Sequence, residues 1–123
     1  MMAEVIAVNR YALRDVAAFA AAVPALVARV QDQGHKGVRS YRFFCPTPSE
    51  GRAVVIYDDA EAWVGHHDLV MGWPELAALR AAADLEEVLL FGPVTPAMQV
   101  WFDRMGLGPR VRLMGEPVAG FLR

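Results

Sequence analysis

Apolar residues recur along this chain with two different spacings, and the change from one to the other predicts the order of its elements. Residues 3–10 are apolar at most odd and most even positions, which is typical of a strand that is covered on both faces. After Asp15, which can cap a helix, apolar residues recur every three or four positions as far as Val30. We therefore expect a strand at 3–10 and then a helix that stops near Gly34.

The next part of the chain has the pattern of a β-hairpin. Residues 38–45 and 52–57 are rich in strand-forming residues. The segment 46–51 between them, Pro-Thr-Pro-Ser-Glu-Gly, is typical of a turn or short loop. Two adjacent strands joined by such a segment favour an antiparallel pair.

A second helical region follows the hairpin. Asp58 and Glu61 have the spacing of a capping box and predict a helix from about 59 to 70. A shorter helix is expected at 74–83 and a fourth strand at 85–91. The resulting order, β-α-β-β-α-β, predicts an α+β chain with the ferredoxin-like split arrangement, in which helices cover one face of an antiparallel sheet.

The other face of such a sheet still requires burial. The strands at 3–10 and 85–91 are apolar on both sides, so we expect the helix-free face to pack against the same face of a second copy. A two-fold homodimer is the predicted assembly.

The C-terminal quarter predicts an extension of this unit. We place a ferredoxin-like domain at 1–92 and an extension at 93–123, in which Thr95 caps a helix as far as about Met105. Residues 110–114 could add an edge strand, and the last residues would form an arm. The helix carries an apolar stripe, so we expect the extension to pack on the same domain or on its dimer partner.

Composition and charge narrow the range of partners. The formal net charge is -2 and basic residues do not cluster, which argues against a nucleic-acid partner. The most apolar run is too short and too interrupted for a membrane span. The single cysteine, Cys45, and a start without the features of a secretory signal predict a cytoplasmic protein.

One stretch gathers most of the chemically distinctive side chains. Within residues 53–76, a window of eleven residues holds aromatic, imidazole and thioether groups together: Trp63, His66, His67, Met71 and Trp73. Trp63 and His67 are four residues apart and so share a helix face, while Asn9 ends a strand that the topology places at the sheet centre. This spacing predicts a small-molecule pocket between the sheet and the second helix.

Each of these residues also has a purely structural interpretation. A large aromatic such as Trp63 at an apolar helical position is usually core, and adjacent histidines point about 100° apart and do not readily bind one metal ion. Asn9 can serve the backbone instead of a ligand, and Tyr41 can be core. No zinc spacing, phosphate loop, dinucleotide fingerprint or nucleophile elbow occurs, so neither a metal nor a nucleotide cofactor is predicted.

The pattern from residue 3 to about 92 resembles the antibiotic biosynthesis monooxygenase group of dimeric α/β barrels, which is related to quinol and heme-degrading monooxygenases. The resemblance rests on the first strand ending in Asn9-Arg10, the GVRSYRFF strand, the VVIYDDAEAW junction and the aromatic second helix. It implies a ferredoxin-like fold that pairs into a dimeric barrel. In the heme-degrading branch, an Asn near the end of the first strand and a Trp on the second helix lie beside the ligand, and Asn9 and Trp63 occupy the corresponding places here.

The resemblance implies a reaction as well as a fold. In the monooxygenase branch a phenol- or anthrone-like substrate loses a proton and its anion reduces oxygen without a cofactor. This assigns acid-base or oxyanion roles to His67, His66 and Asn9, and substrate contacts to Trp63, Tyr41 and Trp73. Two alternatives remain: a heme-binding or heme-degrading protein, although Trp73 stands near the position of the iron-ligating histidine, and a noncatalytic dimer that binds a small hydrophobic ligand.

Overall fold

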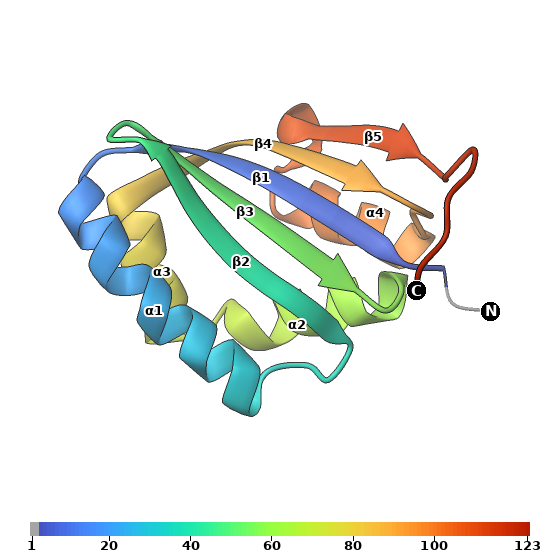
Figure 1. The fold of residues 1–123 in the computed structure, drawn as a ribbon, viewed down its shortest axis with the longest axis horizontal. Helices are drawn as coiled ribbons and strands as arrows, with labels where there is room; N and C mark the ends of the chain where they lie inside the picture. Colours follow the sequence, from blue (N-terminus) through green and yellow to red (C-terminus); the bar gives the residue numbers. More distant parts are fainter. Residues whose placement is uncertain (1–2) are drawn as a thin grey trace.

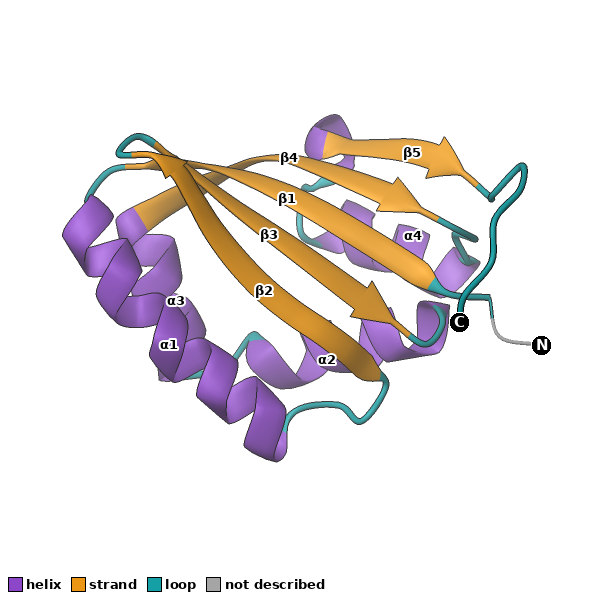
Figure 2. Cartoon of the chain, in the orientation of Figure 1, coloured by secondary structure: helices purple, strands orange, loops and turns teal. Residues whose placement is uncertain are grey.

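A five-stranded sheet with its helices on one face forms the body of residues 3–123, the part of the chain that this computed structural model describes (Figure 2). The elements in chain order are β1 (Val5–Leu13), α1 (Val16–Gln33), β2 (Val38–Thr47), β3 (Glu50–Tyr57), α2 (Ala60–Val70), α3 (Pro74–Ala82), β4 (Ala83–Phe91), α4 (Pro96–Arg104), the 3-10 turn η1 (Gly108–Arg110) and β5 (Val111–Gly115). This order confirms the predicted α+β, ferredoxin-like β-α-β-β-α-β arrangement with an added helix and edge strand.

The strands lie in the order β2-β3-β1-β4-β5, so β1 is the central strand (Figure 1). It pairs antiparallel with β3 on one side and with β4 on the other. β5 runs parallel to β4 and pairs only with its second half, from Val88 onward. A parallel neighbour requires a crossover connection, and α4 supplies it. The first residues of β4, Ala83–Glu87, therefore have no strand on their outer edge among the described residues.

Odd-numbered residues of β1 face the helices and form the core. Val5 and Ala7 are almost fully buried in one cluster with Trp63 of α2. A second cluster holds Phe19 and Leu26 of α1, against which Tyr11 packs. All four α-helices therefore cover the same face of the sheet, and that face is where any enclosed site must lie. None of the helices in residues 3–123 is long and apolar enough to cross a membrane.

The capping residue of α2 differs from the prediction. Asp59, not Asp58, accepts the hydrogen bond from the Ala62 amide, at 2.8 Å. Asp58 instead continues the end of the hairpin, where its amide donates to the Gly37 carbonyl at 2.8 Å. Two consecutive aspartates made the sequence signal ambiguous by one residue. The predicted caps of the other two helices, Asp15 and Thr95, are confirmed.

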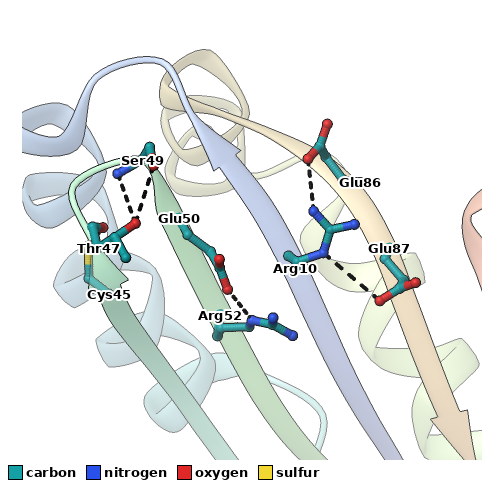
Figure 3. Close-up of polar contacts among 8 residues, drawn as sticks. All are labelled: Arg10, Cys45, Thr47, Ser49, Glu50, Arg52, Glu86 and Glu87. Atoms are coloured by element: carbon teal, nitrogen blue, oxygen red, sulfur yellow. Dashed lines mark hydrogen bonds and ion pairs between the residues drawn. The ribbon is translucent and has the colours of Figure 1, made fainter.

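The β2–β3 hairpin is tighter than the predicted loop at 46–51. Both strands continue into that segment, β2 as far as Thr47 and β3 from Glu50. The Thr47 and Ser49 side-chain oxygens are 3.2 Å apart, and the Ser49 amide donates to Thr47 Oγ1 at 3.2 Å (Figure 3). These local hydrogen bonds pair the polar groups of the turn, so fewer residues are needed to reverse the chain.

The helix-free face of the sheet carries an ordered apolar patch. In this patch three apolar pairs lie side by side across three strands: Val54 and Ile56 on β3, Val8 and Ile6 on β1, and Leu89 and Phe91 on β4. At its end the side chains become charged: Arg10 lies 3.0 Å from Glu86 and Arg52 lies 2.5 Å from Glu50 (Figure 3). An apolar centre bordered by paired charges is the arrangement of a protein–protein interface.

We expect this patch to hold two copies of the chain together. A lysine in place of Val8, at the centre of the patch, should leave the protein monomeric, because a buried unpaired charge opposes association. Light scattering should report about twice the chain mass of 13.5 kDa for the wild type and for an Asp32→Lys control on the exposed side of α1. A soluble wild-type monomer at micromolar concentration would contradict the expected homodimer.

Candidate active site

A cavity of about 590 Å³ lies between the sheet and the helices. Its walls come from all five strands of the sheet on one side, with Val111 as the contribution of β5, and from α2, α3, α4 and η1 on the other. Six of the buried or half-buried lining residues carry an amide, phenol or imidazole group: Asn9, Tyr11, Tyr41, Tyr57, His66 and His67. Most of the lining residues are apolar and the polar groups stand among them, as in many small-molecule sites.

His67 lines this cavity and has a defined tautomer. Its Nδ1 lies 2.7 Å from the Trp63 carbonyl oxygen, and because a carbonyl can only accept, Nδ1 carries the proton and donates it. Nε2 is then left as the unprotonated nitrogen. The imidazole also stacks on the Trp63 ring with centroids 3.9 Å apart, which fixes its orientation.

His66 and Asn9 line the same cavity, and each has a buried polar atom without a partner. His66 is 3% exposed, and its Nδ1 has no hydrogen-bond partner among the residues that the structure describes. The same holds for Oδ1 of Asn9, whose Nδ2 donates to the Tyr11 hydroxyl at 3.4 Å. A buried polar atom without a partner is costly, and in a cavity wall it is the group that a ligand can satisfy.

Three tyrosines supply hydroxyl groups, and two of them were not predicted from the sequence. Tyr41 was an expected contact and lies edge-on to His66 at 5.3 Å between ring centroids. Tyr11 and Tyr57 also line the cavity, and the ring centroid of Tyr57 lies 5.7 Å from that of His66. The alternation of β1 and β3 does signal both, because Tyr11 shares a strand face with Asn9, and Tyr57 is 2% exposed on the inner face of β3.

The interior of the cavity is uncharged at neutral pH. Burial raises the pKa of each of the three phenols, Tyr11, Tyr41 and Tyr57, so all remain protonated donors. Burial lowers the pKa of His66 to about 3, with smaller contributions from His67 and His35. Burial lowers the pKa of His67 to about 4, against the opposing effects of its bond to Trp63 and of nearby Asp68. Both imidazoles are therefore neutral acceptors.

We expect these two histidines to make the protein acid-sensitive. In the unfolded chain each histidine takes up a proton as the pH falls through about 6.5. In the folded chain neither histidine is protonated until the pH falls to about 4 or below. Stability should be complete above pH 6.5 and fall by up to about 1.4 kcal/mol per pH unit per histidine below it. Thermal unfolding measured from pH 7 to 4 should show a shallower dependence for His66→Phe than for wild type. If stability falls with pH equally steeply in the two proteins, protonation of His66 does not cause the acid sensitivity.

Trp63 lies where the sequence suggested, whereas Trp73 does not. Trp63 lines the cavity as expected, but it is 2% exposed and His67 covers one face of its ring. Trp73 does not line the cavity. It packs against the cluster of α1 and α3, and the Arg29 guanidinium lies 4.3 Å from its ring centroid. Because Pro74 starts a new helix immediately after it, Trp73 is not carried on the α2 face that lines the cavity.

The extension after residue 92 contributes to the cavity, which the sequence did not indicate. Trp101, Met105, Leu107 and Arg110 all line it. Trp101 is 5% exposed, lies edge-on to Trp63 at 6.2 Å between centroids, and donates from Nε1 to Asp68 at 2.8 Å. The sequence signal for this was the apolar stripe of α4, which predicted packing but not a place in the site wall.

The residues present do not suit heme. Tyr41 and Tyr57 pack against the His66 ring, and Trp63 and Trp101 against the His67 ring. Neither imidazole can approach an iron at the centre of a wide macrocycle without displacing these side chains. Within residues 3–123 no group of three or more His, Cys, Asp or Glu side chains is placed to hold a metal ion.

Comparison with known proteins supports the fold. Neither protein-family models nor curated proteins match the sequence. Among solved structures, MupZ from Pseudomonas fluorescens is 17% identical with a TM-score of 0.78, over 100% of this chain and 91% of that one. SnoaB from Streptomyces nogalater, a cofactor-independent oxygenase, is 20% identical with a TM-score of 0.64, over 76% of this chain and 95% of that one.

A third structure belongs to the group that the sequence resembled. A candidate antibiotic biosynthesis monooxygenase from Caulobacter crescentus is 16% identical with a TM-score of 0.58, over 76% of this chain and 93% of that one. These likenesses confirm that the chain has the fold of the antibiotic biosynthesis monooxygenase-like proteins. At these identities they speak for the fold and not for a substrate.

Proposed function

We propose that this protein is a cofactor-independent monooxygenase acting on a small aromatic substrate of the phenol, quinol or anthrone type. The observation that carries the proposal is the convergence, in one apolar cavity, of an oriented neutral imidazole with two unsatisfied polar atoms. His67 Nδ1 is bound to the Trp63 carbonyl, while His66 Nδ1 and Asn9 Oδ1 lack partners among the described residues. The fold shared with a cofactor-independent oxygenase supports the same reaction type.

The first step in this proposal is proton removal by His67. Its Nε2 lone pair takes a proton from the substrate, and the positive charge formed on the ring stays hydrogen-bonded to the Trp63 carbonyl. With a pKa of about 4, the imidazole in the empty cavity is a weak base. A substrate anion formed beside it favours the charged ring and raises that pKa, so the two charges stabilise each other in the apolar space.

Asn9 and His66 then act on the substrate's oxygens. The second Nδ2 hydrogen of Asn9 can donate to the developing oxyanion, since the first goes to Tyr11. His66 Nδ1 can accept a hydrogen bond from a substrate hydroxyl if the ring carries its proton on Nε2. In this arrangement the protein binds, deprotonates and holds the anion, while the substrate itself supplies the electrons.

The oxygen chemistry balances without any further reductant. For an anthrone, the substrate anion gives one electron to dioxygen, and the radical pair combines to form a carbon–oxygen bond. The resulting peroxide takes the proton from the imidazolium. Loss of the second carbon-bound hydrogen as a proton, with cleavage of the oxygen–oxygen bond, releases water and leaves a carbonyl. In sum, the ring methylene group and dioxygen give a carbonyl group and one molecule of water.

Oxygen consumption with an anthrone tests the proposal. The purified protein with dithranol should consume one molecule of dioxygen per substrate, faster than the spontaneous oxidation measured with heat-denatured protein. With labelled oxygen gas, one labelled atom should enter the quinone product and one should appear in water. Hydrogen peroxide in place of labelled quinone would contradict a monooxygenase, and no acceleration with anthrones or hydroquinones would contradict the whole proposal. A Soret band on titration with hemin would favour the heme-binding alternative instead.

A further inference from the structure

The part of the cavity wall that is exposed to solvent is here called the cavity mouth. Four of the lining residues are exposed, namely Arg80, Asp84, Glu86 and Arg110, and every other lining residue is buried or half-buried. These four come from the end of α3, the start of β4 and η1. The mouth therefore lies along the part of β4 that β5 leaves unpaired, between α3 on one side and η1 on the other.

The acidic residues around this mouth are already neutralised. Asp84 forms an ion pair with Arg14 of the β1–α1 connection. Glu86 lies 3.0 Å from Arg10, and the adjacent Glu87 lies 3.6 Å from Arg112 (Figure 3 shows Arg10 between the two glutamates). Each carboxylate thus has an arginine of its own, and none of these three arginines lines the cavity.

The two arginines that do line the mouth have no such partner. Neither Arg80 nor Arg110 forms an ion pair with another residue in the described part of the chain. Among the described residues, the one hydrogen bond of the Arg110 guanidinium goes to the Gly106 carbonyl, at 3.3 Å. Because the whole chain has a formal charge of -2, this concentration of positive charge is local and does not reflect a generally basic surface.

We propose that Arg80 and Arg110 recognise a carboxylate on the ligand, at the end that remains outside the apolar part of the cavity. A guanidinium presents a planar fork that matches a carboxylate in two parallel hydrogen bonds. The interior of the cavity offers only neutral groups, so it suits the aromatic part, whereas an anion there would lose its hydration without gaining a charge partner. The ligand class is an aromatic hydroxy acid, with its hydroxyl toward Asn9 and its carboxylate at the mouth.

This proposal rests on the cavity being the substrate site of the proposed function, and binding measurements test it without turnover. Suitable probes are 6-hydroxy-2-naphthoic acid and its methyl ester, which share the ring and the phenol and differ in the charge. Quenching of Trp63 and Trp101, both in the cavity wall, reports occupancy. At low salt we expect the acid to bind about five-fold or more tightly than the ester, and the preference to shrink as salt is added.

Variants at the two arginines test whether these side chains cause the tighter binding of the acid. Arg80→Gln and Arg110→Gln should each weaken binding of the acid about three- to ten-fold, leave the ester unchanged, and in combination bring the acid to the level of the ester. Arg39→Gln is the matched control, because it removes one exposed arginine on β2 that does not line the cavity. Circular dichroism should show that all variants are folded.

The outcomes separate this inference from the proposed function. Equal binding of acid and ester to the wild type, including binding of neither, would overturn the carboxylate site, and so would an Arg39→Gln effect as large as that of Arg110→Gln. A protein that prefers the acid but consumes no oxygen with any phenol or anthrone would keep the anion site and lose the monooxygenase. Rapid oxidation of neutral anthrones by a protein that binds the acid no better than the ester would support the monooxygenase and overturn the carboxylate site.

Discussion

Replacing His67 with asparagine should lower turnover on an active phenol or anthrone about 10²-fold or more, with little change in substrate affinity. The asparagine amide can still donate to the Trp63 carbonyl, as Nδ1 does at 2.7 Å, but the chain loses the nitrogen that accepts the proton. Removal of a general base commonly costs this much, because the proton must then go to water. Oxygen uptake under steady-state conditions gives kcat and KM separately.

His35→Asn is the matched control for the His67 variant. His35 lies between α1 and β2, its Nδ1 accepts from the Gly37 amide at 2.9 Å, and it is not part of the cavity wall. It should retain wild-type kcat. A His67→Asn protein that is folded and fully active would assign the base to another group, and a loss confined to KM would make His67 a binding residue only.

Trp101→Ala should destabilise the protein by about 3 to 5 kcal/mol. Trp101 is 5% exposed and packs against Trp63, so its removal leaves a void in the larger core cluster and leaves Asp68 without its 2.8 Å hydrogen bond. Val100→Ala is an adjacent control, since Val100 is 59% exposed on the same helix. Chemical denaturation monitored by circular dichroism gives both free energies of unfolding.

The Trp101 experiment also decides how the extension relates to the domain. If 93–123 is part of the core, the variant unfolds in a single transition at lower denaturant and its activity falls at the same time. A Trp101→Ala protein as stable as Val100→Ala would mean that α4 packs only superficially. That result would contradict the expectation from the sequence that the extension packs firmly on the domain.

Much of this fold could be predicted from the sequence because its signals are local. Asp15 and Thr95 are each followed at once by an apolar helical stripe, and both do cap their helices. The errors arose where two neighbouring residues offer the same chemistry. Asp58 and Asp59 are both good capping residues, and only the hydrogen bond of Asp58 to Gly37, which depends on the folded hairpin, decides between them.

The site was harder to predict than the fold because its walls come from distant segments. The spacing of Trp63 and His67 within α2 correctly predicted that they share one helix face, where their rings stack. Spacing could not indicate that Arg110, 43 positions beyond His67, would line the same cavity. It also included Trp73, which does not line this cavity because it lies after α2 ends and directly before α3 begins at Pro74.

The pairing of the strands gives the sheet a gradient of local stability. Breaking β1 free requires the loss of hydrogen bonds to both β3 and β4, along with the burial of Val5 and Ala7. β5, by contrast, is held by one neighbour over a few residues, and its side chains after Val111 are exposed. Openings of β5 therefore cost much less free energy than openings of β1. The cavity mouth borders this weakly held strand, so the wall beside it can move on a timescale at which the centre of the sheet stays closed.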